Sequence, residues 1–340
     1  MSKTKAIAAV NPCKWSDLFA FSGQSDLPSW RLSEVLRKRG WSEYEAWMRH
    51  EKALCFQTLR ELVDSFPTWQ NRKRFGRPPA DERDLLAALV LRQMLDIPFT
   101  RLPEAMQDFQ DALRFSRVHG RSTLTQKNRG RRMQKLLRRF FDFIVARLGR
   151  RKSILITDAT GFSNYARTWR DASYSDRAKN NWIKAHCVLE HETGLFIRVE
   201  FTPGRVHESQ VFPKLWNSIP PTIKPIRSVA DAAFFGNDCL TAAKATGATP
   251  IHDIKSNARH VKFPATNYQQ LVNFATHWPN RYYALKAPRI EIEGAFGQTK
   301  TSYGHRLTCH KQIARENQVM AKFLAHNVTG LAFARHVTAS

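Results

Sequence analysis

The chain has 340 residues, 42% of them apolar, and its 54 Lys and Arg residues against 29 Asp and Glu give a formal net charge of +25. This composition excludes a wholly disordered basic tail, because it supplies enough apolar material for a core, and it favours a polyanionic partner over a small-molecule substrate. The longest unbroken apolar run, residues 85–91, is too short for a membrane span of about 20 residues, so the expected location is the cytoplasm.

The five cysteines are scattered along the sequence, and none forms a Cys-x2-Cys pair. An odd number without metal-ligand spacing predicts free thiols in place of a disulfide framework or a zinc ribbon. The residues are Cys13, Cys55, Cys187, Cys239 and Cys309.

Residues 1–150 are predicted to form a basic, helical domain. Apolar residues recur at three-and-four spacing over 41–63 and 84–95, and Pro98 ends the second of these helices. Another helix is expected over 102–115, followed by a polar turn at 120–124 that caps a cationic helix.

The cationic helix predicts a helix-turn-helix-like contact with DNA, although ordinary helical bundles share this pattern. Thirteen Lys or Arg residues and one acid lie between Arg114 and Arg151. Leu136, Phe140 and Ile144 give the helix one side that packs, which leaves its cationic side for phosphates. The cations expected to bind DNA are Arg121, Arg129, Arg131, Arg132 and Lys135.

From residue 151 the pattern changes to short apolar strands, which predicts a second domain of mixed α/β type over 151–340. Strands are expected over 154–157, 182–189 and 195–201, with a hairpin turn at 192–194 between the last two. A helix, a strand, a helix, a strand and a closing helix follow, at 209–217, 226–230, 237–246, 250–254 and beyond.

Two aspartates directly follow predicted strands. Asp158 comes after Ile-Leu-Ile-Thr, and Asp231 comes after Ser-Val-Ala. A single Asp after a strand often only caps a loop. A pair on neighbouring strands instead presents two hard oxygen ligands to one cation.

A third acidic candidate lies in a helix predicted to start near Pro288. On a helical wheel, Arg289, Glu293 and Lys300 fall within about 40° of one another. Glu291 is expected to point away from them toward solvent, so Glu293 is the candidate. An exposed ion pair between Arg289 and Glu293 would explain the same spacing.

Asp158, Asp231 and the Arg-x3-Glu-x6-Lys spacing of Arg289, Glu293 and Lys300 resemble the catalytic signature of the insertion-sequence DDE transposases. The resemblance implies an RNase H-like mixed sheet with flanking helices, preceded by an all-α DNA-binding domain. It also implies metal-dependent cleavage at the ends of an element, followed by strand transfer into target DNA.

Two further segments are similar to the run that this family carries between its first two acidic residues. They start at Asn181 and at Thr202, and the second reads Thr-Pro-Gly-x2-His-Glu-Ser. The similarity covers about residue 72 to the C-terminus. One departure is Lys286, which stands where the family's signature often has Tyr.

The resemblance implies a role for each of the quoted residues. Asp158, Asp231 and Glu293 are expected to be catalytic ligands of two Mg²⁺ ions, which Mn²⁺ can replace, because the set is all oxygen. Arg289 and Lys300 are expected to hold phosphates of double-stranded DNA. Lys184 is a further candidate for DNA contact, for which a solvated strand face is an equal explanation. For His207 and Glu208, a structural role is favoured over a general-base pair.

Two alternative functions remain at this point. One is a catalytically silent DNA-binding regulator derived from such a transposase, and the other is an RNase H-like nuclease without strand transfer. A homodimer on DNA is expected, because two element ends must be held together. The expected location is the cytoplasm of a prokaryote, at the nucleoid.

Overall fold

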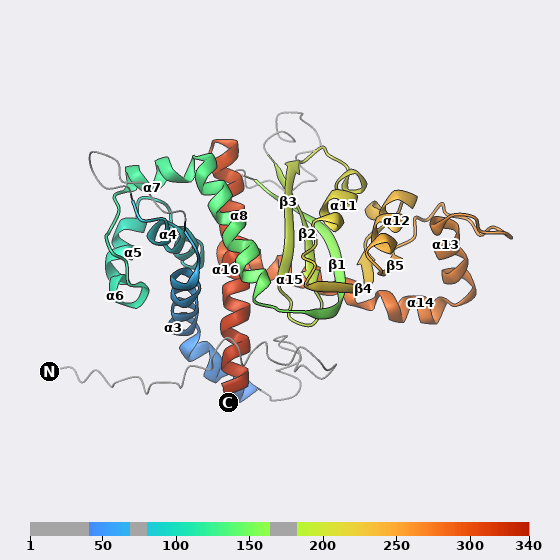
Figure 1. Ribbon diagram of the computed structural model, residues 1–340, viewed down its shortest axis with the longest axis horizontal. Coiled ribbons are helices and arrows are strands. Elements are labelled where there is room, and N and C mark those ends of the chain that lie inside the picture. Colours follow the sequence, from blue (N-terminus) through green and yellow to red (C-terminus); the bar gives the residue numbers. More distant parts are fainter. Residues whose placement is uncertain (1–40, 69–79, 164–181, 340) are drawn as a thin grey trace.

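A five-stranded mixed sheet forms the centre of the computed structural model, which describes residues 41–68, 80–163 and 182–339 (Figure 1). The strands are β1 (Arg151–Phe162), β2 (Ile183–Glu190), β3 (Phe196–Pro203), β4 (Ile223–Ala230) and β5 (Thr249–His252), in the spatial order β3-β2-β1-β4-β5. The first three strands pair antiparallel, and β4 and β5 run parallel to β1. The mixed α/β class predicted for this part of the chain is confirmed, and its sheet with flanking helices fits an RNase H-like fold.

Helices cover both faces of the sheet. α11 (Glu208–Asn217) contacts β2 and β3, and α12 (Asn237–Ala245) contacts α11 and β5. The opposite face carries α15 (Ile290–Tyr303) and α16 (Gln312–Ala339), since Phe196 of β3 meets the rings of both Phe296 and Phe323. The β2–β3 hairpin turns at Gly194, whose φ of +67° favours glycine.

The helical part before the sheet comprises α3 (Trp41–Ser65), α4 (Glu82–Met94), α5 (Leu102–Asp108), α6 (Gln110–Leu113), α7 (Arg121–Asn128) and α8 (Arg131–Ala146). Two sequence predictions were wrong here. The helix expected over 102–115 is broken at Phe109, and the polar turn at 120–124 is the start of α7, with Gly120 as its N-cap. Ser and Thr in a first helical turn have the composition of a loop, which explains the second error.

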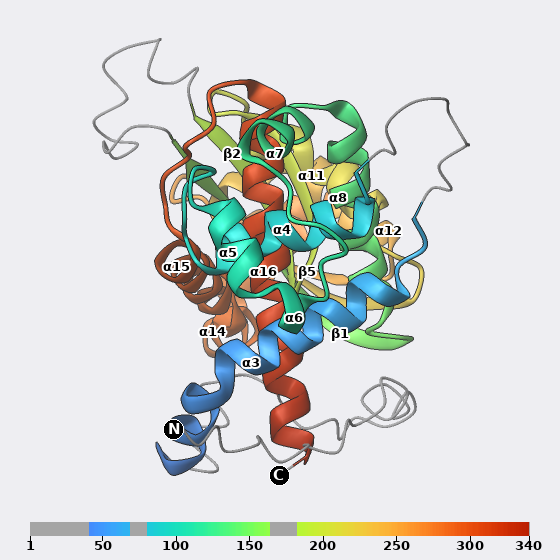
Figure 2. The same cartoon turned by 90° about the vertical axis from the view of Figure 1, so that its left-hand side faces the viewer.

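The long helix α16 joins the helical part to the sheet. It packs against α3, α4, α7 and α8 on one side and against α15 and β3 on the other, as Figures 1 and 2 show. One continuous core therefore runs from Leu59 of α3 through Leu155 of β1 to Phe323 of α16. The domain boundary near residue 150 remains a prediction.

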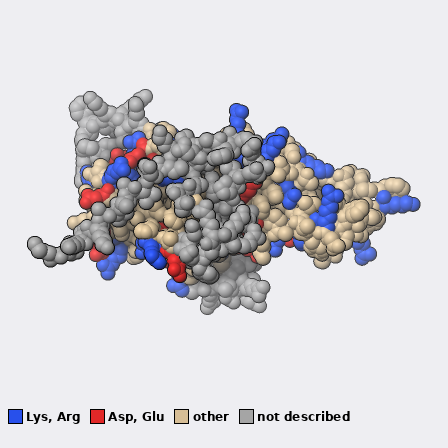
Figure 3. All heavy atoms as spheres, turned by 90° about the horizontal axis from the view of Figure 1, so that it is seen from below, with Lys and Arg blue, Asp and Glu red and all other residues tan. Residues whose placement is uncertain are grey.

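A pair of helices between β5 and α15 was missing from the sequence prediction. α13 (Asn267–His277) and α14 (Pro279–Lys286) belong to an arm, residues 254–289, which extends from the sheet at the right of Figure 1. Thr266 and Gln269 form a capping box at the start of α13, a spacing that the sequence does contain. The arm holds six Lys or Arg residues and no Asp or Glu, and Figure 3 shows cations at this end of the molecule.

The four cysteines within the described ranges are buried and free, as predicted. Cys13 and Asn181 lie outside the described residues. Over the part of the chain that the structure describes, no helix is both long and apolar enough to cross a bilayer.

Replacing Gly304 with Ala should destabilise the fold by about 1–3 kcal/mol. Gly304 ends α15 with a φ of +76°, and a Cβ there would overlap the carboxylate of Asp96. Gly297→Ala is the matched control, because a Cβ at this helical position would meet nothing within 4 Å. Urea unfolding of both variants checks the prediction, and equal midpoints would contradict it.

Candidate active site

The parallel pairing of β1 and β4 brings two aspartates side by side. Thr157 pairs with Ala230, so Asp158 and Asp231 occupy the next position on the two strands. The sequence predicted that Asp158 directly follows its strand. This was wrong, because β1 continues to Phe162 and Asp158 lies within it. The antiparallel partner β2 keeps β1 extended beyond the point where β4 ends, and an apolar run alone cannot reveal this.

The direction of Asp158 follows from the alternation of side chains along β1. Thr157 faces α11, since its hydroxyl accepts a hydrogen bond of 3.0 Å from the Trp216 indole nitrogen. Asp158 therefore faces the opposite side together with Phe162, whose ring centroid lies 5.5 Å from the Lys300 Nζ of α15. Asp231 caps the short 3₁₀ turn Ala232–Phe234 by accepting from the Ala233 amide at 2.9 Å.

Both aspartates are harder to ionise than an exposed aspartate. Burial, helped by the charges of Asp231 and Glu293, raises the pKa of Asp158 to about 7 against the opposing effects of the hydrogen bond from the Ala159 amide and the charge of Arg289. Burial also raises the pKa of Asp231, with a further rise from the charge of Glu208 and a lowering by Arg289. The site therefore concentrates carboxylates whose mutual repulsion a cation would relieve.

Helix α15 brings the third carboxylate and two cations to this face. Arg289 ends a 3₁₀ turn, Ala287–Arg289, and its Nη1 lies 2.8 Å from Glu293 Oε1. Burial lowers the pKa of the half-buried Lys300, whereas the charge of Asp158 raises it. The charges of Glu293 and Arg289 act on the pKa of Asp158, and the charge of Asp158 acts on the pKa of Lys300, so these groups interact electrostatically.

Glu291 has a different environment from the one predicted. Its Oε2 lies 2.8 Å from the His191 Nδ1 of the β2–β3 hairpin, and its side chain is 20% exposed. Glu293 is the more exposed of the two, at 49%. The prediction that Glu291 points to solvent was wrong, because a helical wheel carries no information about the hairpin that lies opposite.

The donor chemistry at the site fits a hard divalent cation. Asp158 and Asp231 supply adjacent carboxylates, and burial raises the pKa of the nearby Cys187 well above its usual value, which keeps it a thiol. Within the described ranges, no group of three or more His, Cys, Asp or Glu side chains is arranged to hold a metal ion. The third carboxylate, Glu293, pairs with Arg289 through Oε1.

Replacing Asp158 with Asn should raise the unfolding temperature at pH 8 by about 5 °C. The pKa of about 7 in the folded state exceeds the unfolded value near about 3.9, so the folded state binds more protons between these values. The stability of the unmodified chain therefore falls as the pH rises through this window, and the variant escapes this loss. Thermal unfolding at pH 4 and pH 8 measures it.

The difference between the two proteins should nearly disappear near pH 4, where the carboxyl group is protonated in the folded state and about half protonated in the unfolded state. Mg²⁺ at pH 8 should stabilise the unmodified chain and leave the Asn variant unchanged, because only a carboxylate binds the ion well. Equal unfolding temperatures at pH 8 would contradict the raised pKa.

Lys184 and His207, which the sequence also singled out, have structural partners. Lys184 Nζ lies 2.6 Å from Glu208 Oε1 and donates to the Val206 carbonyl at 3.0 Å. His207 is the N-cap of α11, and its Nδ1 accepts from the Ser209 amide at 3.3 Å. The charge of Glu208 raises the pKa of Asp231, an interaction that sequence reasoning did not predict.

A second aspartate directly after a strand was missed by sequence reasoning. Ala230 of β4 pairs with His252 of β5, so Asp253 occupies the position next to Asp231. Asp253 directly follows β5, just as Asp231 directly follows β4. This repeated pattern is the signal that the sequence contained.

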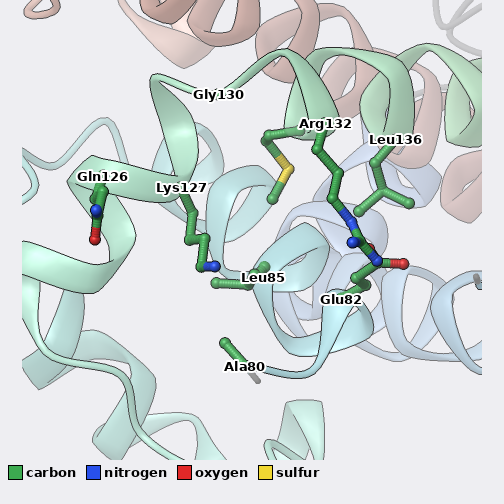
Figure 4. Close-up of a pocket in the computed structure, with 9 residues that line it drawn as sticks. Ala80, Glu82, Leu85, Gln126, Lys127, Gly130, Arg132 and Leu136 are labelled. Atoms are coloured by element: carbon green, nitrogen blue, oxygen red, sulfur yellow. The ribbon is translucent and has the colours of Figure 1, made fainter. Parts of the chain in front are cut away.

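The cations of the helical part that are expected to bind DNA lie on α7 and α8, apart from Arg129, which is the C-cap of α7. Arg132 Nη2 lies 2.6 Å from Glu82 Oε1 at the edge of a hollow of about 300 Å³ between α4, α7 and α8, into which Lys127 points (Figure 4). The other expected cations are exposed, namely Arg121, Arg129, Arg131 and Lys135.

A family model described as "Transposase DDE domain" matches residues 149–328, a segment that begins just before β1 and ends within α16. Searches of curated proteins and of solved structures find no match. The matched segment covers more than half of the chain and contains the two adjacent aspartates and the whole of α15. The chain therefore belongs to the family of insertion-sequence DDE transposases.

Proposed function

We propose that this transposase cleaves DNA at the ends of an insertion element and joins the freed ends to target DNA in one carboxylate-lined site. The observation that carries the proposal is the β1–β4 register, which sets Asp158 beside Asp231 on the side where α15 carries Glu293. Family membership supports DNA as the substrate.

Asp158, Asp231 and Glu293 would hold two Mg²⁺ ions, which Mn²⁺ can replace, in keeping with the general use of divalent metals in this family. When bound, such ions activate the attacking oxygen and stabilise the leaving oxygen of a phosphodiester. The raised pKa of Asp158 keeps this carboxyl partly protonated near pH 7, so ion binding should strengthen above that pH.

Two cations beside the carboxylates would hold the DNA backbone. Arg289 carries a planar guanidinium that already pairs with carboxylates, and the same fork fits the oxygens of a phosphate. Lys300, whose pKa the charge of Asp158 raises, would act as a point charge on the reacting phosphate. Lys184 would first have to exchange Glu208 for a phosphate.

The exposed cations of α7 and α8 would bind DNA outside the reaction site, in the manner of a helix-turn-helix. Replacing Arg129 and Arg131 together with Ala should weaken binding and reduce the slope of log K against log salt by about 2, because each lost phosphate contact releases about one counterion fewer. Arg101→Ala is the control, since this exposed residue of the helical part pairs with Glu104. Anisotropy of a labelled duplex at several salt concentrations measures both. An unchanged slope would contradict this DNA contact.

The function is tested by incubating the full chain with a labelled DNA fragment that carries its own gene and both flanking regions. The proposal predicts cleaved and joined products with Mg²⁺, formed by a homodimer that holds both ends. Cleavage without joined products would favour the nuclease without strand transfer. Binding without cleavage would favour the silent regulator. Since the substrate is chromosomal DNA, the proposed site of action is the nucleoid.

A further inference from the structure

Asp253, directly after β5, binds two of the arm's cations. Its Oδ1 lies 2.5 Å from Lys286 Nζ, and its Oδ2 lies 3.1 Å from Arg289 Nε. The two oxygens thus hold cations from two segments, the last turn of α14 and the 3₁₀ turn that follows. The Asp253 amide donates to the Ala230 carbonyl at 2.8 Å, which fixes this residue to β4.

These contacts form a continuous chain of charges from the sheet edge to the proposed reaction site. Arg289 is bound through Nε to Asp253 and through Nη1 to Glu293, and its charge acts on both Asp158 and Asp231. The side chain of Asp253 is 20% exposed, that of Arg289 is 30% exposed and that of Glu293 is 49% exposed. The chain of charges is therefore anchored at its more buried end and reaches solvent at the end where DNA would approach.

The side chain of Lys286 is held by Asp253 and by two tyrosine rings. Its Nζ lies 5.0 Å from the ring centroid of Tyr283 and 5.4 Å from that of Tyr282, while it binds Asp253. The Tyr282 hydroxyl donates to the His252 carbonyl at 2.9 Å, immediately before Asp253. Lys286, which stands where the family signature often has Tyr, is thus paired with Asp253 directly after β5.

We infer that Asp253 is a positioning residue, which holds Arg289 in the orientation that serves the proposed cleavage reaction. The inference rests on the proposed function. Asp253 acts through Arg289, because its carboxylate binds the Nε edge of the guanidinium while Nη1 faces Glu293. Without this contact, the pair with Glu293 is the one ion pair left to Arg289 among those described, so the guanidinium is free to turn away from the position where it would hold a phosphate.

The test compares single-turnover cleavage of the gene-bearing DNA fragment by the full chain and its variants at saturating Mg²⁺. Asp253→Asn should cleave about ten-fold more slowly, as is typical when a supporting side chain is removed. Arg289→Gln should also be slow, and the double variant should be no slower than Arg289→Gln alone, because both changes remove one interaction. A merely structural role for Asp253 would not produce this loss of additivity.

Asp238→Asn, an exposed aspartate on α12, is the matched control and should cleave at the unmodified rate. A full cleavage rate for Asp253→Asn would overturn the inference. So would the result that Asp253→Asn slows cleavage by the same factor in the unmodified chain and in the Arg289→Gln variant. Failure of the proposed function is distinguishable, because it would appear as cleavage that persists in Asp158→Asn. Melting curves of the variants confirm that each is folded at the assay temperature.

Discussion

Asp158→Asn is expected to abolish DNA cleavage while leaving DNA binding in place. A metal-held phosphoryl group gains several kcal/mol of transition-state stabilisation, and each 1.36 kcal/mol is a factor of ten, so the rate should fall by about 10³-fold or more. Binding should persist because the exposed cations of α7 and α8 lie on other elements of the fold. Gel-based cleavage of the labelled fragment and anisotropy measure the two properties separately.

Two features make this result interpretable. The Asn side chain keeps an oxygen that can accept from the Ala159 amide, as Asp158 does at 2.7 Å, and the variant is expected to be more stable than the unmodified chain at pH 8. A loss of cleavage therefore cannot be ascribed to unfolding. Asp238→Asn controls for the general effect of removing one acidic charge. Cleavage at an undiminished rate in Asp158→Asn would end the case for a carboxylate-held metal.

The second large effect is expected at Glu293, and Glu291 provides its control on the same helix. Glu293→Gln should lower the cleavage rate by about 10²–10³-fold, because an amide is a poor ligand for Mg²⁺. Its stability should change by only about 0.3–0.5 kcal/mol, since the lost contact is a half-exposed i,i+4 ion pair with Arg289.

Glu291→Gln should show the opposite pattern. This change weakens the contact with His191 in a less exposed place, so stability should fall by about 1 kcal/mol while cleavage stays within about two-fold. Cleavage rates and urea midpoints of the two variants form one experiment. If Glu291→Gln lost cleavage and Glu293→Gln kept it, the assignment of the third carboxylate would be reversed.

Local patterns in the sequence predicted the parts of the fold that local interactions determine. The strands β2 to β5 and the helices α11 and α12 were located from apolar runs and turn residues, because each is marked by its own side chains. The length of β1 was underestimated, since its second half is held by β2 and contains polar residues such as Thr160.

Features that depend on distant segments were less accessible. α14 lacks an apolar stripe, and both α13 and α14 pack on a small core with Phe235 and Ile251, which local periodicity does not reveal. The partner of Glu291 is a histidine that lies a hundred positions earlier in the chain. Such contacts follow from the topology, and no helical wheel contains them.

The candidate site shows the same division. Asp158, Asp231 and Glu293 were selected from motifs, and their environments became visible only through the parallel register and the packing of α15. Glu208 and Asp253 escaped notice because their importance arises from neighbouring strands and not from their own sequence surroundings. Asp253 could have been identified from the sequence, because it follows a short strand-like segment as Asp158 and Asp231 do.

The packing of α16 also has a consequence for synthesis of the chain. Residues 312–339 leave the ribosome after every other described element, yet they cover apolar surfaces of α3, α4 and α8. Those surfaces must stay exposed to the translation machinery and to chaperones until α16 emerges. A chain truncated before Gln312 would therefore expose these apolar surfaces and be prone to aggregation. Proteases should degrade it before it could compete for chromosomal sites.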